Sequence, residues 1–309
     1  MAEAIPILPP SRVLVAGGTG FLGGHVVKAL LGRGYRVRCL VRPQSVAKLA
    51  AQPALSTVVG NVEDAESVSR AAAGCQAAVN LVGIIAETAE ARYEKIHLEG
   101  ARNLVAACVA QGVRRLIHVS ALGARGSSAS RFFRTKWEGE EVVRGSSLAY
   151  TIFRPSVIHG AGGALAQMLA RLARLPVLMP IPGAGDGLLQ PVMAEEVAWL
   201  IAESLSLPRT AGHSYDVGGA ELRTLEGLLQ AVSQVVNGKR RRVARVPLWL
   251  LRAAAYAAEK GMRRPMLTRG QLELLSEVNV CSLAPLRADF GFRPRGLEEA
   301  LRSYMGKSA

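Results

Sequence analysis

Acidic residues, aromatic residues, cysteines and long apolar runs are all scarce in this sequence. Its 24 aspartates and glutamates face 38 lysines and arginines, and the resulting net charge of +14 favours anionic partners such as phosphorylated cofactors or acidic lipids. Aromatics make up only 5% of the 309 residues, so the apolar half of the chain is mostly small and aliphatic. Such a composition suits close packing of helices on a sheet better than an all-β sandwich.

The cysteines and the apolar runs are too few and too scattered for several classes of protein. The four cysteines (Cys39, Cys75, Cys108 and Cys281) form no CxxC pair and have no histidines at ligand spacing. We therefore expect no metal site and no disulfide framework, only buried thiols in a reducing cytoplasm. No apolar stretch reaches the roughly 18 residues of a membrane-spanning helix. The first residues do not resemble a signal peptide, so we expect a cytoplasmic protein.

The first half of the chain alternates short apolar segments with segments of helical spacing. The alternation predicts an α/β fold of the Rossmann type, a doubly wound parallel sheet covered on both faces, followed by a smaller, mostly helical C-terminal lid. We expect a dinucleotide-binding domain over 1–159, to which 188–217 returns, and a lid made of 160–187 and 218–309. The predicted strands of the first half lie at 13–17, 35–41, 56–60, 77–83, 114–120 and 149–155.

A glycine triplet follows the first predicted strand. Gly17, Gly20 and Gly23 have the spacing GxxGxxG and lie between an apolar strand and an amphipathic helix. In that context glycines permit a tight turn, close approach of the backbone to a pyrophosphate, and close packing of helix on strand. The N-terminus of the helix offers unpaired N–H groups to the phosphates. The loop therefore predicts binding of a dinucleotide.

The end of the second predicted strand indicates which dinucleotide. An NAD site usually carries an acidic residue there, about 20 residues beyond the glycines, to hold the ribose 2′-hydroxyl. Here the segment 37–46 contains no Asp or Glu, and Arg42 stands at that place with Arg38 nearby. A guanidinium suits a 2′-phosphate through its charge and planar donors. We therefore expect NADP(H) in preference to NAD(H).

Several stretches together resemble the extended and atypical short-chain dehydrogenase/reductases, the epimerase/dehydratase-like group. In the first half these are AGGTGFLGG (16–24), NLVG (80–83), HVSALGA (118–124), RTKWEGEE (134–141) and FRPSVIHG (153–160). The later stretches QPVMAEEVA (190–198), YDVGG (215–219) and LTRGQLELL (267–275) resemble the subgroup that contains the dehydrogenase-like accessory subunit of respiratory complex I and its bacterial relatives.

The resemblance implies a set of cofactor-binding residues. The loop would meet the pyrophosphate, Arg42 the adenosine ribose phosphate, and the ends of later strands the adenine and nicotinamide. Asn61 departs from the Asp that is common at its position. The implied residues are Gly17, Thr19, Gly20, Phe21, Leu22, Gly23, Arg42, Asn61 and Val62 beside the adenine, Val82, Gly83, Ser120, Lys136, and Pro155 and Ser156 beside the nicotinamide.

The catalytic residues of that family are incomplete here. Active members use Ser, Tyr and Lys, with Tyr four residues before Lys on one helix face. Ser120 and Lys136 are present, but Phe132 stands at the Tyr position, and a phenyl ring has no proton to transfer. We favour an NADP(H)-binding protein without ordinary turnover, structural or redox-sensing, in a setting such as a respiratory complex.

An active NADPH-dependent reductase or epimerase is the alternative. Its proton donor would be Tyr93, His97, His159 or a water held by Ser120. The apolar, glycine-rich segments 158–178 and 188–193 would then line a pocket for a hydrophobic small molecule, such as a quinone or isoprenoid.

Basic residues flank an apolar helical segment in the second half. The run Lys239 to Arg242 precedes the segment 246–262, and Arg263 and Arg264 follow it. One interpretation is a helix on an anionic membrane surface, which would make the protein peripheral on the inner face of the membrane. The other is a lid helix over the substrate pocket, preceded by a solvated turn. The basic run lacks the interleaved aromatics of a nucleic-acid surface, and we expect no nucleic acid partner.

Overall fold

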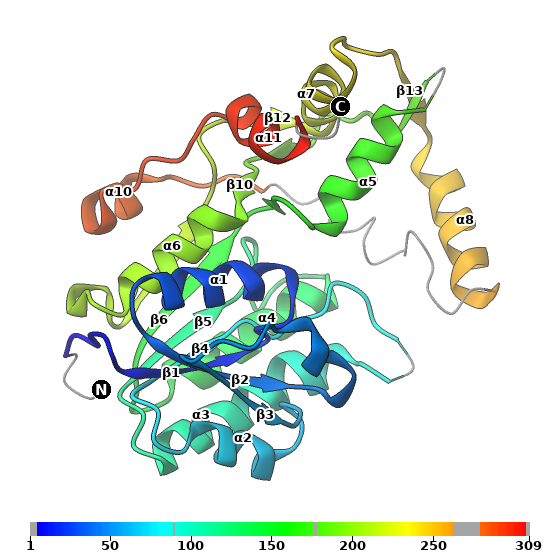
Figure 1. The fold of residues 1–309 in the computed structure, drawn as a ribbon. Coiled ribbons are helices and arrows are strands. Elements are labelled where there is room, and N and C mark those ends of the chain that lie inside the picture. The colour runs from blue at the N-terminus through cyan, green and yellow to red at the C-terminus, as the bar shows by residue number, and fades with distance from the viewer. Residues whose placement is uncertain (1–4, 89, 176–177, 262–278, 307–309) are drawn as a thin grey trace. The chain divides into compact units, whose positions relative to one another are not determined.

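The computed structural model describes residues 5–88, 90–175, 178–261 and 279–306, and its chain forms two compact units (Figure 1). The first unit comprises Met1–Pro155, Ala194–Val217 and Leu283–Phe292, and the second comprises Ser156–Met193, Gly218–Ser282 and Arg293–Ala309. The stretch 267–275 and the pair Arg263 and Arg264, both noted in the sequence, lie outside the described residues.

A seven-stranded parallel sheet forms the centre of the first unit. Its strand order is β11-β6-β5-β4-β1-β2-β3, so the direction of winding changes between β1 and β4. Open sheets of this kind bind ligands at the carboxyl ends of the strands beside that change. The predicted doubly wound fold is confirmed. The strands are β1 Arg12–Ala16, β2 Arg36–Val41, β3 Leu55–Val59, β4 Ala77–Asn80, β5 Arg115–Val119, β6 Ala149–Pro155 and β11 His213–Val217.

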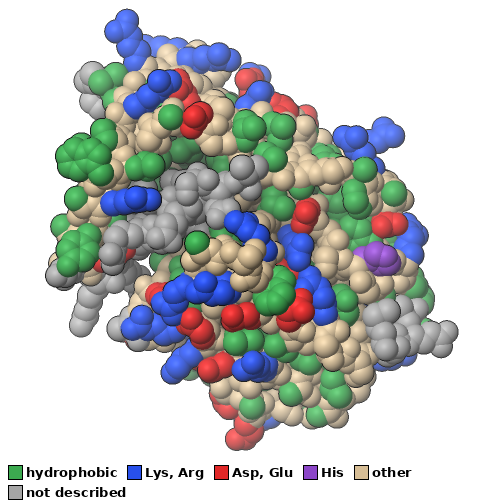
Figure 2. Space-filling view, turned by 180° about the vertical axis from the view of Figure 1, so that it is seen from behind, with side chains coloured by type: hydrophobic (Ala, Val, Ile, Leu, Met, Phe, Trp, Pro, Cys, Tyr) green, Lys and Arg blue, Asp and Glu red, His purple; other side chains and the backbone are tan. Residues whose placement is uncertain are grey.

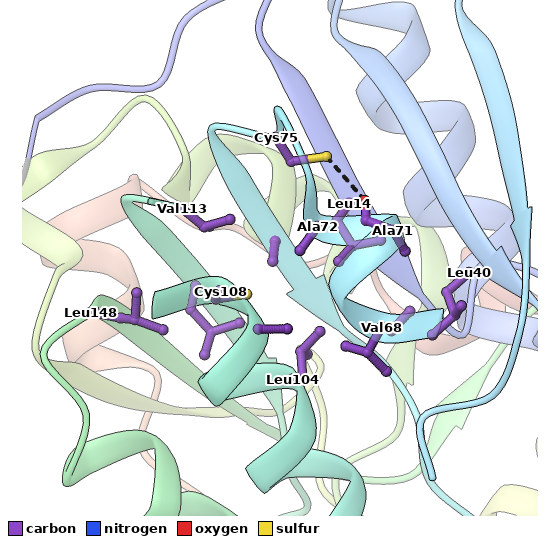
Figure 3. Close-up of a cluster of buried hydrophobic side chains, with 14 of the residues drawn as sticks. Leu14, Leu40, Val68, Ala71, Ala72, Cys75, Leu104, Cys108, Val113 and Leu148 are labelled. Carbon is purple, nitrogen blue, oxygen red and sulfur yellow. Dashed lines mark hydrogen bonds between the residues drawn. The ribbon is translucent and has the colours of Figure 1, made fainter. Parts of the chain in front are cut away.

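Helices cover both faces of this sheet because the side chains of its central strands are buried on both sides. In β1, Val13 and Val15 alternate with Leu14 and Ala16, and all four are fully buried. Figure 3 shows the cluster that Leu14 forms with side chains of α2 and α3. On the other face α1 packs against α6. The helices are α1 Phe21–Gly32, α2 Ala65–Ala72, α3 Gly100–Ala110, α4 Arg131–Arg144, α6 Ala194–Ser204 and α10 Ala284–Phe290.

One predicted helix and one predicted boundary differ from the structure. The segment 93–110 has helical spacing in the sequence and indicates one helix, but it begins with a π-helical segment, Glu94–Glu99, before α3. The segment Leu283–Phe292, expected in the lid, belongs to the first unit. Its Asp289 accepts a hydrogen bond from the Tyr215 hydroxyl at 2.7 Å, and the Phe290 ring lies 5.2 Å from that of Tyr215. These contacts hold α10 beside β11.

The second unit combines helices with short paired strands. Parallel pairs join β7 (Ile158–His159) to β10 (Val192–Met193) and β8 (Met179–Pro182) to β13 (Val243–Val246). β9 (Leu188–Leu189) pairs with β12 (Arg223–Thr224) in antiparallel fashion. No helix in the described part of the chain is long and apolar enough to cross a membrane. The helices of this unit are α5 Ala164–Ala173, α7 Leu225–Asn237, α8 Leu248–Gly261 and α11 Leu297–Met305.

Candidate cofactor site

The glycine loop packs too closely for side chains at two of its positions. Gly17 follows β1 with φ +89°, and a Cβ on it would lie 3.2 Å from the carbonyl carbon of Leu81. A Cβ on Gly23, in the first turn of α1, would lie 2.1 Å from the carbonyl oxygen of Gly17. The loop therefore turns directly from strand to helix. Sequence reasoning missed Gly18, where a Cβ would lie 2.6 Å from Cys39 Sγ.

The N-terminus of α1 is open to an anion. Gly20 is the N-cap and supplies no side chain to the first turn, and a Cβ there would meet only the Gly17 carbonyl at 3.2 Å. The N–H groups of Phe21, Leu22 and Gly23 have no acceptor within the helix, as at any helix start. Thr19 lies half-buried in the same loop. A pyrophosphate fits these donors and the positive end of the helix dipole.

Arg42 comes directly after β2 and its side chain is exposed. It makes no ion pair with any residue that the structure describes. Arg38 is not available beside it, because its guanidinium donates to the carbonyls of Ala71 (3.2 Å) and Ala73 (2.6 Å) at the end of α2. Of the two arginines noted in the sequence, only Arg42 can reach a ligand at the end of β2.

The two residues after β3 are held by their own loop. Asn61 Nδ2 donates to the Glu63 carboxylate at 2.7 Å. Val62 is buried in the core cluster, and its carbonyl accepts a hydrogen bond from Asn103 at 2.8 Å. A Cβ on Gly100 would lie 3.0 Å from the Val62 side chain. The backbone of this loop is therefore fixed at the carboxyl edge of the sheet.

Ser120 and Lys136 come together at the end of β5. Lys136 Nζ donates to the carbonyl of Val119 at 2.8 Å, and a Cβ on Gly83, after β4, would lie 3.5 Å from the same nitrogen. Ser120 Oγ is buried and has no hydrogen-bond partner among the described residues. A buried hydroxyl without a partner is costly, so its site suits a ligand or water that bonds to it. Val82 is half-buried and Gly83 exposed in the same loop.

Lys136 carries its charge in a site that is almost closed to water. Burial lowers the pKa of Lys136 to about 8, and the nearby Glu140 carboxylate opposes this change. Glu140 was not singled out from the sequence, although it lies four residues after Lys136, on the same helix face. Its fully buried carboxylate accepts hydrogen bonds from Arg154 at 2.6 Å and Arg144 at 2.5 Å. The pair with Arg154 joins α4 to β6, and the pair with Arg144 lies within α4.

Phe132 lies one helical turn before Lys136, and other aromatic rings surround it. Its ring centroid is 5.8 Å from that of Tyr93, 5.6 Å from that of His97 and 5.1 Å from that of Phe133, all with edge-to-face geometry. Phe132, at the position where the resemblance implies a tyrosine, therefore belongs to a cluster of packed rings.

The polar atoms of His97 and Tyr93 are already hydrogen-bonded to the protein. His97 Nε2 accepts the N–H of Ile84 (3.1 Å), so the proton of the neutral ring is on Nδ1, 2.9 Å from Thr135 Oγ1. Burial, and then the charge of Lys136, lower the pKa of His97 to about 2. The Tyr93 hydroxyl donates to the carbonyl of Ile85 at 3.1 Å. Neither residue is arranged to give a proton to a substrate.

The last two predicted residues fall on either side of the boundary between the units. Pro155 ends β6 in the first unit, and its carbonyl accepts a hydrogen bond from Leu122 at 3.0 Å. Ser156 begins the second unit, where its hydroxyl donates to the Asn279 carbonyl at 3.1 Å.

His159 also belongs to the second unit. Its Nδ1 lies 3.0 Å from the Tyr304 hydroxyl, and burial lowers its pKa to about 4. A cavity of about 270 Å³ in this unit is lined by part of the predicted pocket, 160–174, together with Val236, Tyr304 and Met305. Two arginines, Arg171 and Arg174, are among its lining residues, so it is less apolar than the sequence suggested.

Residues 17–169 match the family model described as NAD(P)H-binding. The chain is 34% identical over 170 residues to a ceramide reductase of Caulobacter vibrioides. That match takes in 54% of this chain and 53% of the relative, so the chain spans about half of that protein's length. It is 28% identical to the mitochondrial NADH-ubiquinone oxidoreductase 40 kDa subunit of Neurospora crassa, over 84% of this chain and 69% of the subunit.

A further relative comes from Arabidopsis thaliana. The mitochondrial NADH dehydrogenase 1 alpha subcomplex subunit 9 of that plant is 30% identical, over 72% of this chain and 57% of the relative. Among solved structures, gox2253 matches with a TM-score of 0.75 at 24% identity, covering 96% of this chain and 97% of that one. A UDP-glucose 4-epimerase of Thermotoga maritima matches with a TM-score of 0.71 at 18% identity, over 95% and 97% of the two chains. At these identities the structural matches establish the fold alone.

Proposed function

Because residues 17–169 belong to the NAD(P)H-binding family, we propose that this protein binds NADP(H) and holds it without ordinary dehydrogenase turnover. The relatives named as subunits of NADH-ubiquinone oxidoreductase support a structural or redox-sensing role in a respiratory assembly. Bound NADPH would supply a hydride, and bound NADP⁺ would accept one, at the nicotinamide ring. The chain's own residues would bind and orient it.

Phe132 is the observation that carries the proposal. Ser120 and Lys136 stand where the resemblance implies the family's serine and lysine. The ring of Phe132, at the implied tyrosine position, is packed among Tyr93, His97 and Phe133 and carries no hydroxyl. Loss of the positioned proton donor typically costs about 10²- to 10⁴-fold in rate. Binding would survive this loss, because Lys136 presents N–H donors beside Gly83, and the Ser120 hydroxyl has no partner among the described residues.

The exposed Arg42 supports NADP(H) over NAD(H). It follows β2, where the adenosine ribose of a dinucleotide lies in this fold, and Arg38 is turned away from it. A charge-assisted, bidentate contact to a 2′-phosphate would favour NADPH by about 1 to 3 kcal/mol.

A titration of the purified protein with NADPH and NADH tests this proposal. We expect tighter binding of NADPH, and negligible NADPH oxidation with small carbonyl or quinone acceptors. Arg42→Glu should abolish or reverse the preference. Arg36→Glu is the matched control, because Arg36 is also exposed but lies at the opposite end of β2, and it should leave the preference unchanged. Equal affinities for the two cofactors in the unaltered protein would contradict the assignment of Arg42.

The relative named ceramide reductase supports a second candidate, an active reductase of a hydrophobic substrate. Its proton would come from a water bonded to the buried Ser120 hydroxyl, because Tyr93 and His97 are already bonded to the chain. Substrate-dependent NADPH consumption with a long-chain ketone would support this candidate. Loss of that consumption in Ser120→Ala, with cofactor binding retained, would assign the water to Ser120.

A further inference from the structure

The outward face of α8 is apolar, the reverse of an ordinary surface helix. Ala255 is buried and Leu251 half-buried, so this stripe packs against the unit. At about 100° per residue, Trp249, Leu250 and Tyr256 point to the other side. Trp249 is 68% exposed, Leu250 43% and Tyr256 45%. A globular protein normally places polar residues on such a face.

The N-terminal turn fixes this orientation of α8. β13 leads into the helix and pairs in parallel with β8, which ends at Pro182. Leu248 then lies over the following turn, where a Cβ on Gly183 would be 3.2 Å from its side chain. The outward direction of Trp249 therefore follows from the strand pairing and this contact.

The charges around α8 are almost all positive. The helix contains one acidic residue, Glu259, and an exposed arginine, Arg252. Arg240 and Arg242, in the turn before β13, are exposed and have no ion pair among the described residues. Figure 2, turned by 180° from Figure 1, shows hydrophobic side chains beside Lys and Arg side chains at the edge where α8 lies.

We propose that α8 and the basic turn before β13 form a docking surface for an anionic lipid bilayer. Tryptophan and tyrosine suit the boundary between headgroups and acyl chains, since one part of each ring system is apolar and the other can hydrogen-bond. The arginines would pair with lipid phosphates. The helix has 14 residues, about 21 Å, and lies on the bilayer without crossing it. This surface is independent of the cofactor site.

Flotation of the full chain with lipid vesicles tests the proposal. We expect the protein to float with vesicles of phosphatidylcholine and phosphatidylglycerol at low salt, much less with phosphatidylcholine alone, and less again as salt rises. The double variant Trp249→Ser, Leu250→Ser should weaken binding by about tenfold or more, because it removes the buried apolar area. Its control is Leu222→Ser, an equally exposed leucine of the same unit outside α8.

Charge reversal separates the electrostatic part. Arg242→Glu with Arg252→Glu should lower binding to the anionic vesicles by about tenfold, while Arg36→Glu with Arg114→Glu, two exposed arginines of the first unit, should have little effect. All the substituted positions are exposed, so unchanged thermal melting would show that the fold is intact. Two results would overturn the proposal. One is absence of flotation with anionic vesicles at low salt. The other is self-association that the Trp249 variant loses, which would assign α8 to a second copy of the chain.

Discussion

Lys136 keeps a charged group where the protein leaves almost no water. Among the described residues its ammonium donates to the Val119 carbonyl, and Glu140 supplies the opposing charge from one helical turn away. A bound ribose would give the remaining ammonium protons acceptors. Because burial removes the charged ammonium from water, Lys136 is a cost to the stability of the folded protein.

The pH dependence of folding should reveal this cost. Burial lowers the pKa of Lys136 from 10.5 to about 8. Between these values the unfolded chain binds a proton that the folded chain does not, so stability rises with pH across this window. Below pH 8 Lys136 is protonated in both the folded and the unfolded state, so the folded state carries the full cost of the desolvated ammonium. Lys136→Met should lack this rise. The difference in unfolding free energy between the variant and the parent should therefore change by up to about 3 kcal/mol across the window.

Urea denaturation of both proteins at pH 7 and pH 10 measures this difference. Lys28→Met, at an exposed position of α1, is the control and should follow the parent. Parallel pH curves for the parent and Lys136→Met would show that the ammonium is not desolvated as the structure indicates.

The sequence could locate a single residue where its position depends on a strand, while its role in the site stays a prediction. Arg42 and Ser120 follow strand ends, so the sequence placed both at the carboxyl edge of the sheet. It did not reveal that Arg38 bonds to α2, or that His97 accepts the Ile84 N–H. Those contacts join segments whose separation in space is set by tertiary packing.

The join between β1 and α1 makes two neighbouring glycines behave differently. Gly23 faces the loop, where a Cβ would overlap the Gly17 carbonyl, whereas a Cβ on Gly24 would meet nothing within 4 Å. Gly23→Ala should therefore force the loop and helix apart. We expect a loss of about 1 to 3 kcal/mol in unfolding free energy and of most cofactor binding.

Gly24→Ala is the matched control, one residue further along α1. It should keep cofactor binding and stabilise the protein by up to about 1 kcal/mol, because alanine is the better helix former. Thermal unfolding and a cofactor titration of both variants give the comparison. Equal behaviour of the two would mean that the loop does not pack on the helix as described.

Elements with a strong apolar pattern of their own were predicted well. Elements whose form depends on the segments packed against them were not. The helical spacing after the glycine triplet covers residues 21–32, and these are the bounds of α1. The π-helical turn at Glu94–Glu99 has no local signal. It sits where Gly139 approaches the His97 carbonyl, with a Cβ there only 2.7 Å away. Whether a helical turn widens at such a contact depends on the segment packed against it.

Three buried histidines should make the whole molecule sensitive to acid. Burial lowers the pKa of His97 to about 2, of His118 to about 3 and of His159 to about 4. The unfolded chain protonates these rings near pH 6.5, so below that pH it binds protons that the folded chain does not. Each ring should then remove up to about 1.4 kcal/mol of stability per pH unit.

Urea denaturation at pH 7, 6 and 5 measures the slope. His118→Asn should reduce the slope of unfolding free energy against pH by about the contribution of one histidine. His213→Gln, at an exposed position of β11, should leave the slope unchanged. A stability that stays level from pH 7 to pH 5 would contradict burial of these rings.

At this scale the sequence indicated the fold class and a return of the chain to the first unit near 188–217, but not the second return at Leu283–Phe292. Alternating strands and helices identified the parallel sheet, because each element carries its own pattern. The return of Leu283–Phe292 depends on Phe290 and Asp289 meeting Tyr215, a contact between segments about 70 residues apart. Neither segment has a sequence pattern that indicates this contact.

The chain passes between the two units five times, at residues 155, 193, 217, 282 and 292. During synthesis, therefore, the first unit is still incomplete after its glycine loop and first six strands have emerged from the ribosome. β11 emerges only after part of the second unit, and α10 only after most of it. Neither unit can be excised as one continuous fragment, so the cofactor-binding unit can reach its final form only after Phe292 has been made.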